Sequence, residues 1–164
     1  MATESTAPTG RLFVETTIQA SREKVFEAWT NPKSLAVWMR PKGVTAVDAE
    51  LDVRVGGTLR VVTKGDEGNC EYTGEYRVIE PPSKLVFTWT SKDTDRQPTT
   101  ITVDLAEDEL EPGCQLAVAH SGFVSPAAMQ RYGAGWTVML EKLAVLEKTK
   151  RKRRRKMARV SRSR

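Results

Sequence analysis

Segments rich in β-branched and aromatic residues follow one another through the middle of the chain, at intervals of roughly ten to fifteen residues. Turn-forming sequences separate them, among them Gly56-Gly57, Pro81-Pro82 and Glu111-Pro112-Gly113. This alternation is typical of an antiparallel meander, in which each strand pairs with the next through a short connection. The six strands that we expect are Val44–Leu51, Thr58–Lys64, Cys70–Ile79, Lys84–Ser91, Thr99–Ala106 and Cys114–Ser121.

The flanking segments predict one more strand and three helices. Leu12–Ile18 is β-branched and aromatic, which favours a strand. Ser21 is a good N-cap for a short helix that ends at Asn31-Pro32, and a second short helix ends before Pro41. A long helix begins at Ser125-Pro126, and its apolar stripe consists of Tyr132, Trp136, Leu140 and Leu143. A seven-stranded sheet must bury one face against this helix, so we expect an α+β fold.

The charge of the chain is divided between a body and a tail. Eleven of the 26 Lys and Arg residues lie after Glu147, where there are no acidic residues, which leaves fifteen basic against 21 acidic residues in the body. We expect a disordered leader over residues 1–10, a folded domain over 11–147 and a disordered basic tail over 148–164. The tail, Lys148–Arg164, predicts weak, nonspecific contact with polyanions such as nucleic acids, without base stacking because it has no aromatic residue.

Several classes of protein are not expected. No apolar run is long enough to span a membrane, and the polar start of the chain is unlike a signal peptide, so we expect a cytoplasmic protein. Cys70, Cys114 and the single histidine, His120, match no metal or redox spacing, so we expect no metal and no cofactor. Gly56-Gly57 lacks the pattern of a phosphate-binding loop and indicates a turn between strands.

Strand alternation indicates which side chains share a face of the sheet. The shared faces are Tyr72, Gly74, Tyr76 and Val78; Leu85, Phe87 and Trp89; Ile101, Val103 and Leu105; and Leu116, Val118 and His120. Inward-facing aromatic residues either fill the core or line a ligand pocket, and both interpretations stay open here. As ligand-binding candidates we select Trp38, Tyr72, Tyr76, Phe87, Trp89, His120, Tyr132, Trp136 and Met139, with His120 supplying an orienting hydrogen bond.

His120 would carry any mechanism that needs an imidazole, because it is the only histidine. Its neighbour Ser121 points to the opposite face of the strand, which argues against a Ser–His catalytic pair. A neutral, hydrogen-bonded histidine in a pocket wall fits the pattern better than a general base. We therefore assign no catalytic residue.

A set of short motifs resembles a known family in its order and spacing. The motifs are Trp38 with Pro41 and Gly43, Arg54-Val55-Gly56-Gly57, Gly74-Glu75-Tyr76 before Pro81-Pro82, Leu85-Val86-Phe87-Thr88-Trp89, His120-Ser121-Gly122-Phe123 and Gly135-Trp136. Over residues 11–146 the chain is similar to bacterial relatives of the activator of Hsp90 ATPase. That family belongs to the helix-grip (START-like, SRPBCC) superfamily, with aromatic polyketide cyclases and allergen-like plant lipid binders.

The resemblance implies a curved seven-stranded antiparallel sheet that wraps around a long C-terminal helix and encloses an apolar cavity. It leads us to expect a domain that binds an apolar, aromatic or lipid-like small molecule there, with no catalysis assumed. Two alternatives stay open. One is an accessory module that binds Hsp90 and stimulates its ATPase, and the other is a cyclase- or hydrolase-like enzyme that uses the cavity.

Overall fold

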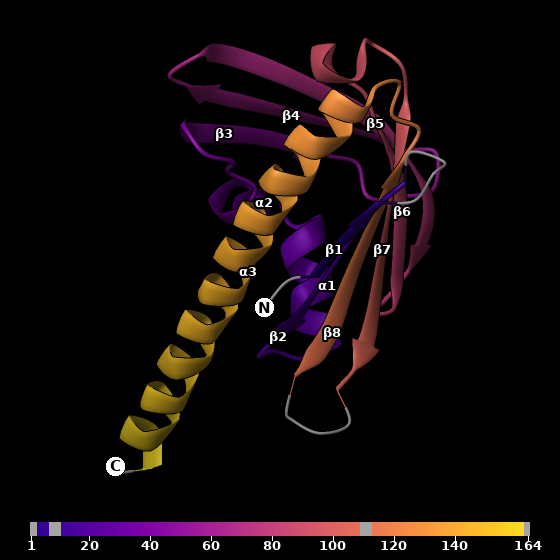
Figure 1. Cartoon of the computed structure of the whole chain (residues 1–164). Helices are drawn as coiled ribbons and strands as arrows, with labels where there is room; N and C mark the ends of the chain where they lie inside the picture. The colour runs from indigo at the N-terminus through magenta and orange to yellow at the C-terminus, as the bar shows by residue number, and fades with distance from the viewer. Residues whose placement is uncertain (1–2, 7–10, 109–112, 163–164) are drawn as a thin grey trace.

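The computed structural model describes residues 3–6, 11–108 and 113–162, and it has a curved sheet with one long helix along it (Figure 1). The sheet is antiparallel, and its strand order is β1 (Thr3–Thr6), β2 (Leu12–Ile18), β8 (Cys114–Ser121), β7 (Thr99–Glu107), β6 (Lys84–Trp89), β5 (Gly68–Glu80), β4 (Thr58–Gly65) and β3 (Val44–Leu51). The helical segments are α1 (Arg22–Thr30), α2 (Pro32–Trp38), α3 (Pro126–Arg162) and the 3-10 turn η1 (Lys92–Thr94). The predicted α+β, helix-grip fold is confirmed, with all seven predicted strands in place.

Two side chains set the path of the chain between β2 and β3. The Ser21 hydroxyl accepts a hydrogen bond from the Lys24 backbone N–H (3.3 Å) and so caps the start of α1. The Asn31 side chain accepts from the backbone N–H groups of Lys33 (2.9 Å) and Ser34 (3.3 Å), which caps α2 one residue after α1 ends. Asn31-Pro32 therefore ends one helix and begins the next.

The core lies between the inner face of the sheet and α3. On α3, Trp136, Leu140 and Leu143 are each at most 1% exposed, so the predicted apolar stripe faces the sheet. Ile101 and Val118, on the central strands β7 and β8, are equally buried. Burial of an aliphatic side chain of this size stabilises the fold by about 1.5–3 kcal/mol, so this interface holds the helix firmly on the sheet.

One face assignment from the sequence is wrong. The pairing of β5 with β6 shifts register between Tyr76 and Val78, which leaves Arg77 as an extra residue. Beyond this bulge the alternation slips by one position, and Ile79 rather than Val78 packs against the core. Val78 therefore does not share the inward face of Tyr76.

The two ends of the chain differ from the expected leader and tail. Thr3–Thr6 pairs with β2 as an added edge strand, because β2 has an open edge and threonine favours extended backbone. At the other end α3 continues as a helix to Arg162 instead of ending near Lys148. Lys and Arg are good helix formers, and a helix that is already nucleated gains one hydrogen bond for each added residue.

Candidate ligand cavity between the sheet and helix α3

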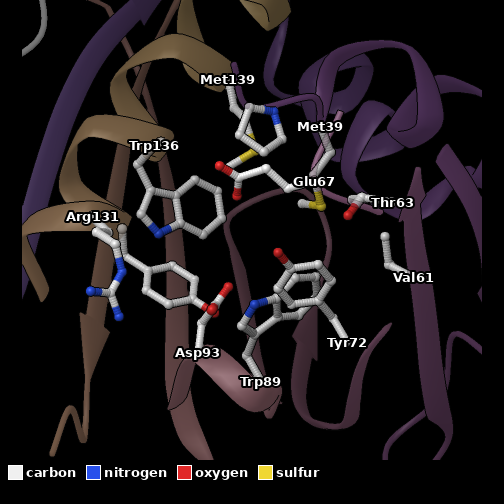
Figure 2. Close-up of a pocket in the computed structure, with 13 residues that line it drawn as sticks. Met39, Val61, Thr63, Glu67, Tyr72, Trp89, Asp93, Arg131, Trp136 and Met139 are labelled. Carbon is white, nitrogen blue, oxygen red and sulfur yellow. The ribbon is translucent and has the colours of Figure 1, made fainter. Parts of the chain in front are cut away.

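A cavity of about 230 Å³ lies between the curved sheet and the N-terminal half of α3 (Figure 2). Strands β4, β5 and β6 supply one wall, and α3 supplies the opposite wall. The loop after α2, the β4–β5 turn and η1 complete the lining. The lining residues are Met39, Pro41, Val61, Thr63, Glu67, Tyr72, Trp89, Asp93, Arg131, Tyr132, Gly135, Trp136 and Met139.

The aromatic residues of the cavity are held in fixed positions by stacking. The rings of Tyr72 and Trp89, on adjacent strands, lie with centroids 4.8 Å apart and planes inclined by 22°. On the helix side, the Trp136 indole stacks on Trp29 of α1 at 5.8 Å. Such pairs add about 0.5–1.5 kcal/mol beyond the burial of their area, so the wall keeps its shape without a ligand.

A chain of hydrogen bonds ties the two walls together through His120. The Trp136 indole N–H donates to Nδ1 of His120 (3.1 Å), so Nδ1 carries a lone pair and the ring proton is on Nε2. Nε2 lies 2.7 Å from Oγ1 of Thr99 and donates to it. The Thr99 hydroxyl in turn donates to the backbone carbonyl of Trp89 (2.6 Å). The polar hydrogens of the Trp136, His120 and Thr99 side chains each have an acceptor.

His120 is neutral in the folded protein. Its side chain is fully buried, and this burial lowers its pKa from 6.5 to about 3, because the charged imidazolium would lose its hydration. Both ring nitrogens are used by protein groups, and His120 does not line the cavity. It positions Trp136 and has no free nitrogen with which to take a proton from a ligand.

Two tyrosine hydroxyls supply uncharged polar groups at the cavity. The Tyr132 hydroxyl lies 3.1 Å from Oγ of Ser91, and burial raises its pKa to about 12. Burial, together with a hydrogen bond to Cys70, also holds the pKa of Tyr72 far above its usual range. Both hydroxyls therefore stay protonated at neutral pH, and they can donate or accept a hydrogen bond but do not supply a charge.

Three charged side chains lie at the cavity. Glu67 comes from the β4–β5 turn, Asp93 from η1 and Arg131 from α3. In Figure 2 the Glu67 carboxylate points towards the space beside Trp136. With two carboxylates and one guanidinium, the polar part of the lining carries a net charge of −1.

The structure separates the nine candidate residues into two groups. Tyr72, Trp89, Tyr132, Trp136 and Met139 line the cavity, whereas Trp38, Tyr76, Phe87 and His120 do not. The Trp38 indole N–H donates to the backbone carbonyl of Ala28 (2.9 Å), and its side chain packs edge-on against Trp29. Tyr76 and Phe87 border a void of only about 10 Å³, too small to hold more than one water molecule.

Sequence reasoning did not select several residues that line the cavity. Glu67 and Asp93 belong to turns, and Arg131 and Gly135 lie on α3 away from its apolar stripe. Gly135 has no atom within 4 Å of the position a Cβ would take, because it faces the open space. The sequence does contain a signal for Gly135, which is its place one residue before the core residue Trp136. A glycine at such a position leaves space for a ligand between the helix and the sheet.

Two kinds of feature are absent from the described residues. Within residues 3–6, 11–108 and 113–162, no three His, Cys, Asp or Glu side chains are grouped so that they could hold a metal ion. No helix in this part of the chain is both long and apolar enough to cross a membrane.

The curved sheet, the long helix and the cavity between them define a helix-grip protein. The sequence profile of the family described as "Activator of Hsp90 ATPase homolog 1-like protein" matches residues 19–147. The chain therefore belongs to this family. No curated protein matches it.

Solved structures of similar fold come from several organisms. A protein from Rhodobacter sphaeroides is 24% identical, with a TM-score of 0.76 over 89% of this chain and 97% of that one. A protein from Chromobacterium violaceum is 22% identical, with a TM-score of 0.74 over 86% and 98%. An HSP90 activator from Plasmodium falciparum is 22% identical, with a TM-score of 0.66 over 84% and 95%. At these identities the likeness establishes the fold alone.

Proposed function

We propose that this protein binds a small aromatic molecule in the cavity between its sheet and α3. The observation that carries the proposal is the lining itself, in which Tyr72, Trp89, Tyr132 and Trp136 surround an open space of about 230 Å³. Ligand sites of this kind are mostly apolar, with a few polar groups that orient the ligand. The bound molecule is held between the sheet and the helix, with its polar end towards Glu67 and Asp93.

The cavity volume limits the size of the ligand. An engineered cavity of about 150 Å³ holds benzene, and typical sites for drug-sized molecules measure about 300–1,000 Å³. A cavity of 230 Å³ lies between these sizes, which favours a molecule of one or two rings. A sterol or a long acyl chain exceeds it, so an aromatic ligand is favoured over a lipid.

The charges select the polar group of the ligand. Glu67 and Asp93 outnumber Arg131, so a ligand with an ammonium group or a hydrogen-bond donor is favoured over a carboxylate. A cation also interacts well with the faces of Trp and Tyr rings. The ligand class we propose is an aromatic amine of one or two rings.

The test is calorimetric titration of the full chain with 2-naphthylmethylamine and with 2-naphthoic acid. We expect the amine to bind at least fivefold more tightly than the acid. Gly135→Leu places a side chain in the open space and should weaken amine binding at least tenfold. Ala134→Leu is the matched control, because Ala134 is the exposed neighbour on the same helix and this change should leave binding intact. Equal binding by both variants would overturn the cavity assignment.

A second candidate function is stimulation of the Hsp90 ATPase. It is supported by the description of the family and by the similarity to the HSP90 activator of Plasmodium falciparum. The assay is the ATP turnover of a bacterial Hsp90 with the full chain added in excess. If the Gly135→Leu variant stimulates ATP turnover as strongly as the parent protein, Hsp90 binds to a surface outside the cavity. An unchanged turnover at saturating concentration would rule this function out for that Hsp90.

A further inference from the structure

The last four turns of α3 carry ten of the 26 Lys and Arg residues of the protein. We call residues 148–162 the C-terminal extension; Figure 1 shows its yellow end beyond the strands of the sheet. The eleven basic residues after Glu147 include Arg164, so ten of them lie in the extension. From Lys152 to Arg162 every residue is exposed. At 1.5 Å per residue the extension is about 22 Å long.

The basic residues of the extension are spread around the helix, and five of them point away from the body. At 100° per residue, Lys148, Lys152, Arg153, Lys156 and Arg159 span about 140° of the circumference. We call these five exposed residues the outward face. Arg154, Arg151 and Arg155 lie at about 240°, 300° and 340° from Lys148, so Arg154 is opposite the outward face and Arg155 borders it.

The other side of the extension faces acidic groups of the body. Arg151, Arg154 and Arg155 line a hollow of about 450 Å³ with Glu23, Glu107 and Asp108. The same hollow contains Lys24 and Arg22, which pairs with Glu107 at 3.4 Å, so its three acidic side chains offset only part of the charge of its five basic ones. In the described part of the chain, Lys152, Arg153 and Lys156 form no ion pair. The outward face therefore presents three charged side chains, Lys152, Arg153 and Lys156, that no ion pair within the described residues offsets.

We propose that the outward face of the C-terminal extension binds duplex DNA, lying in the major groove with its Lys and Arg side chains on the flanking phosphates. The major groove of B-form DNA is about 12 Å wide and admits an α-helix with its side chains. A length of about 22 Å covers about six base pairs at 3.4 Å each. Binding of this kind is driven by charge, so it carries little sequence preference.

The residues of the extension favour DNA over other polyanions. A helix that lies on a membrane needs a broad apolar face, usually with Trp, Phe or Leu, whereas the apolar residues after Glu147 larger than alanine are Met157 and Val160. Single-stranded nucleic acids are bound largely by stacking on aromatic rings, and the extension has none. The major groove of duplex RNA is too deep and narrow for a helix.

The salt dependence of binding follows from the outward face. Five phosphate contacts give a slope of about −4.5 in a plot of log K against log salt concentration. Affinity should then fall by about 500-fold between 50 and 200 mM NaCl. The assay is fluorescence anisotropy of a labelled 24-base-pair mixed-sequence DNA duplex, titrated with the full chain. A slope between 0 and −1 would overturn the proposal.

Two matched variants test which face binds. Lys152→Gln/Arg153→Gln/Lys156→Gln removes three charges from the outward face, and Arg151→Gln/Arg154→Gln/Arg155→Gln removes three from the hollow. Glutamine keeps helix propensity in both. In the first variant, the magnitude of the salt-dependence slope should decrease by about 2.7. At 50 mM NaCl, the loss of DNA affinity should be at least tenfold larger in the first variant than in the second. Equal losses would mean that net charge alone attracts DNA, which would overturn the assignment to one face.

The choice of polyanion has its own test. A 24-base-pair RNA duplex of the same sequence should bind at least fivefold more weakly than the DNA, because its major groove excludes the helix. Equal affinity for the two duplexes would overturn placement in the groove. Binding to anionic phosphatidylserine vesicles that is tighter than binding to DNA would overturn the choice of partner. Gly135→Leu should not alter any of these results, so they are independent of the cavity.

Discussion

Replacement of His120 by glutamine tests whether a buried neutral imidazole makes the fold sensitive to acid. In the folded protein the pKa of His120 is lowered to about 3 by burial, whereas an unfolded chain has the ordinary value of 6.5. Between pH 6.5 and pH 3, His120 binds a proton in the unfolded chain but not in the folded one, so acid favours unfolding. The loss is complete only near pH 3, where the folded state also binds the proton.

The size of the effect follows from the two pKa values. Each pH unit below 6.5 costs about 1.4 kcal/mol of unfolding free energy, which amounts to about 2 kcal/mol between pH 7 and pH 5. The imidazole is fully buried, so solvent does not screen this cost. Other titrating groups are the same in the parent and in His120→Gln and cancel in the comparison.

Urea unfolding followed by circular dichroism at pH 7, 6 and 5 measures both proteins. His120→Gln loses hydrogen bonds to Trp136 and Thr99 and should be less stable at pH 7, but its stability should fall by about 2 kcal/mol less than that of the parent on going to pH 5. Parallel loss in the two proteins would refute a buried neutral His120. If the variant does not fold, ¹⁵N spectra of the only imidazole in the parent decide instead: the Nε2–H tautomer should persist at pH 5.

Three further changes probe other features. Gly74→Ala should destabilise the protein by about 3 kcal/mol or more in urea unfolding, because its Cβ would meet the Thr88 carbonyl oxygen at 1.9 Å; an unchanged midpoint would contradict this close approach. Glu147→Met should raise the unfolding free energy by about 1 kcal/mol, because the carboxylate is 1% exposed, has no hydrogen-bond partner among the described residues and is offset only by the long ion pair with Lys150 at 3.7 Å; a loss of stability would show that this ion pair outweighs the cost of burial. Iodoacetamide at pH 8 should modify Cys70 at least tenfold faster than Cys114, which is buried and has its pKa raised to about 11 by burial; equal rates in the native state would contradict the burial of Cys114.

The sequence alone predicts the strands and helices well, because local chemistry sets them. Val44–Leu51 and Cys114–Ser121 have the same bounds in the structure as in the prediction, since turn residues mark both ends of each. The bulge at Arg77 has no such local signal and depends on how β5 pairs with β6. The sequence underpredicts the length of α3 for a different reason: a run of like charges is typical of a disordered segment, whereas here it continues a helix that tertiary packing has already formed.

The cavity is harder to predict because residues from distant segments form it. Alternation along β6 indicates that Trp89 points inward, but which aromatic residues fill the core and which border open space depends on the curvature of the sheet. His120 illustrates the limit. Its inward direction follows from strand alternation, whereas its partners Thr99 and Trp136 are brought together by the pairing of β7 with β8 and by the position of α3.

Helix α3 carries both the wall of the cavity and the basic extension on a single continuous rod. Gly135 and Arg159 are 24 residues apart on it, which corresponds to about 36 Å along the axis. A tilt of about 5° at the cavity would displace the far end by about 3 Å. The packing of Trp136, Leu140 and Leu143 on the sheet therefore also fixes where the basic extension lies, about 36 Å away.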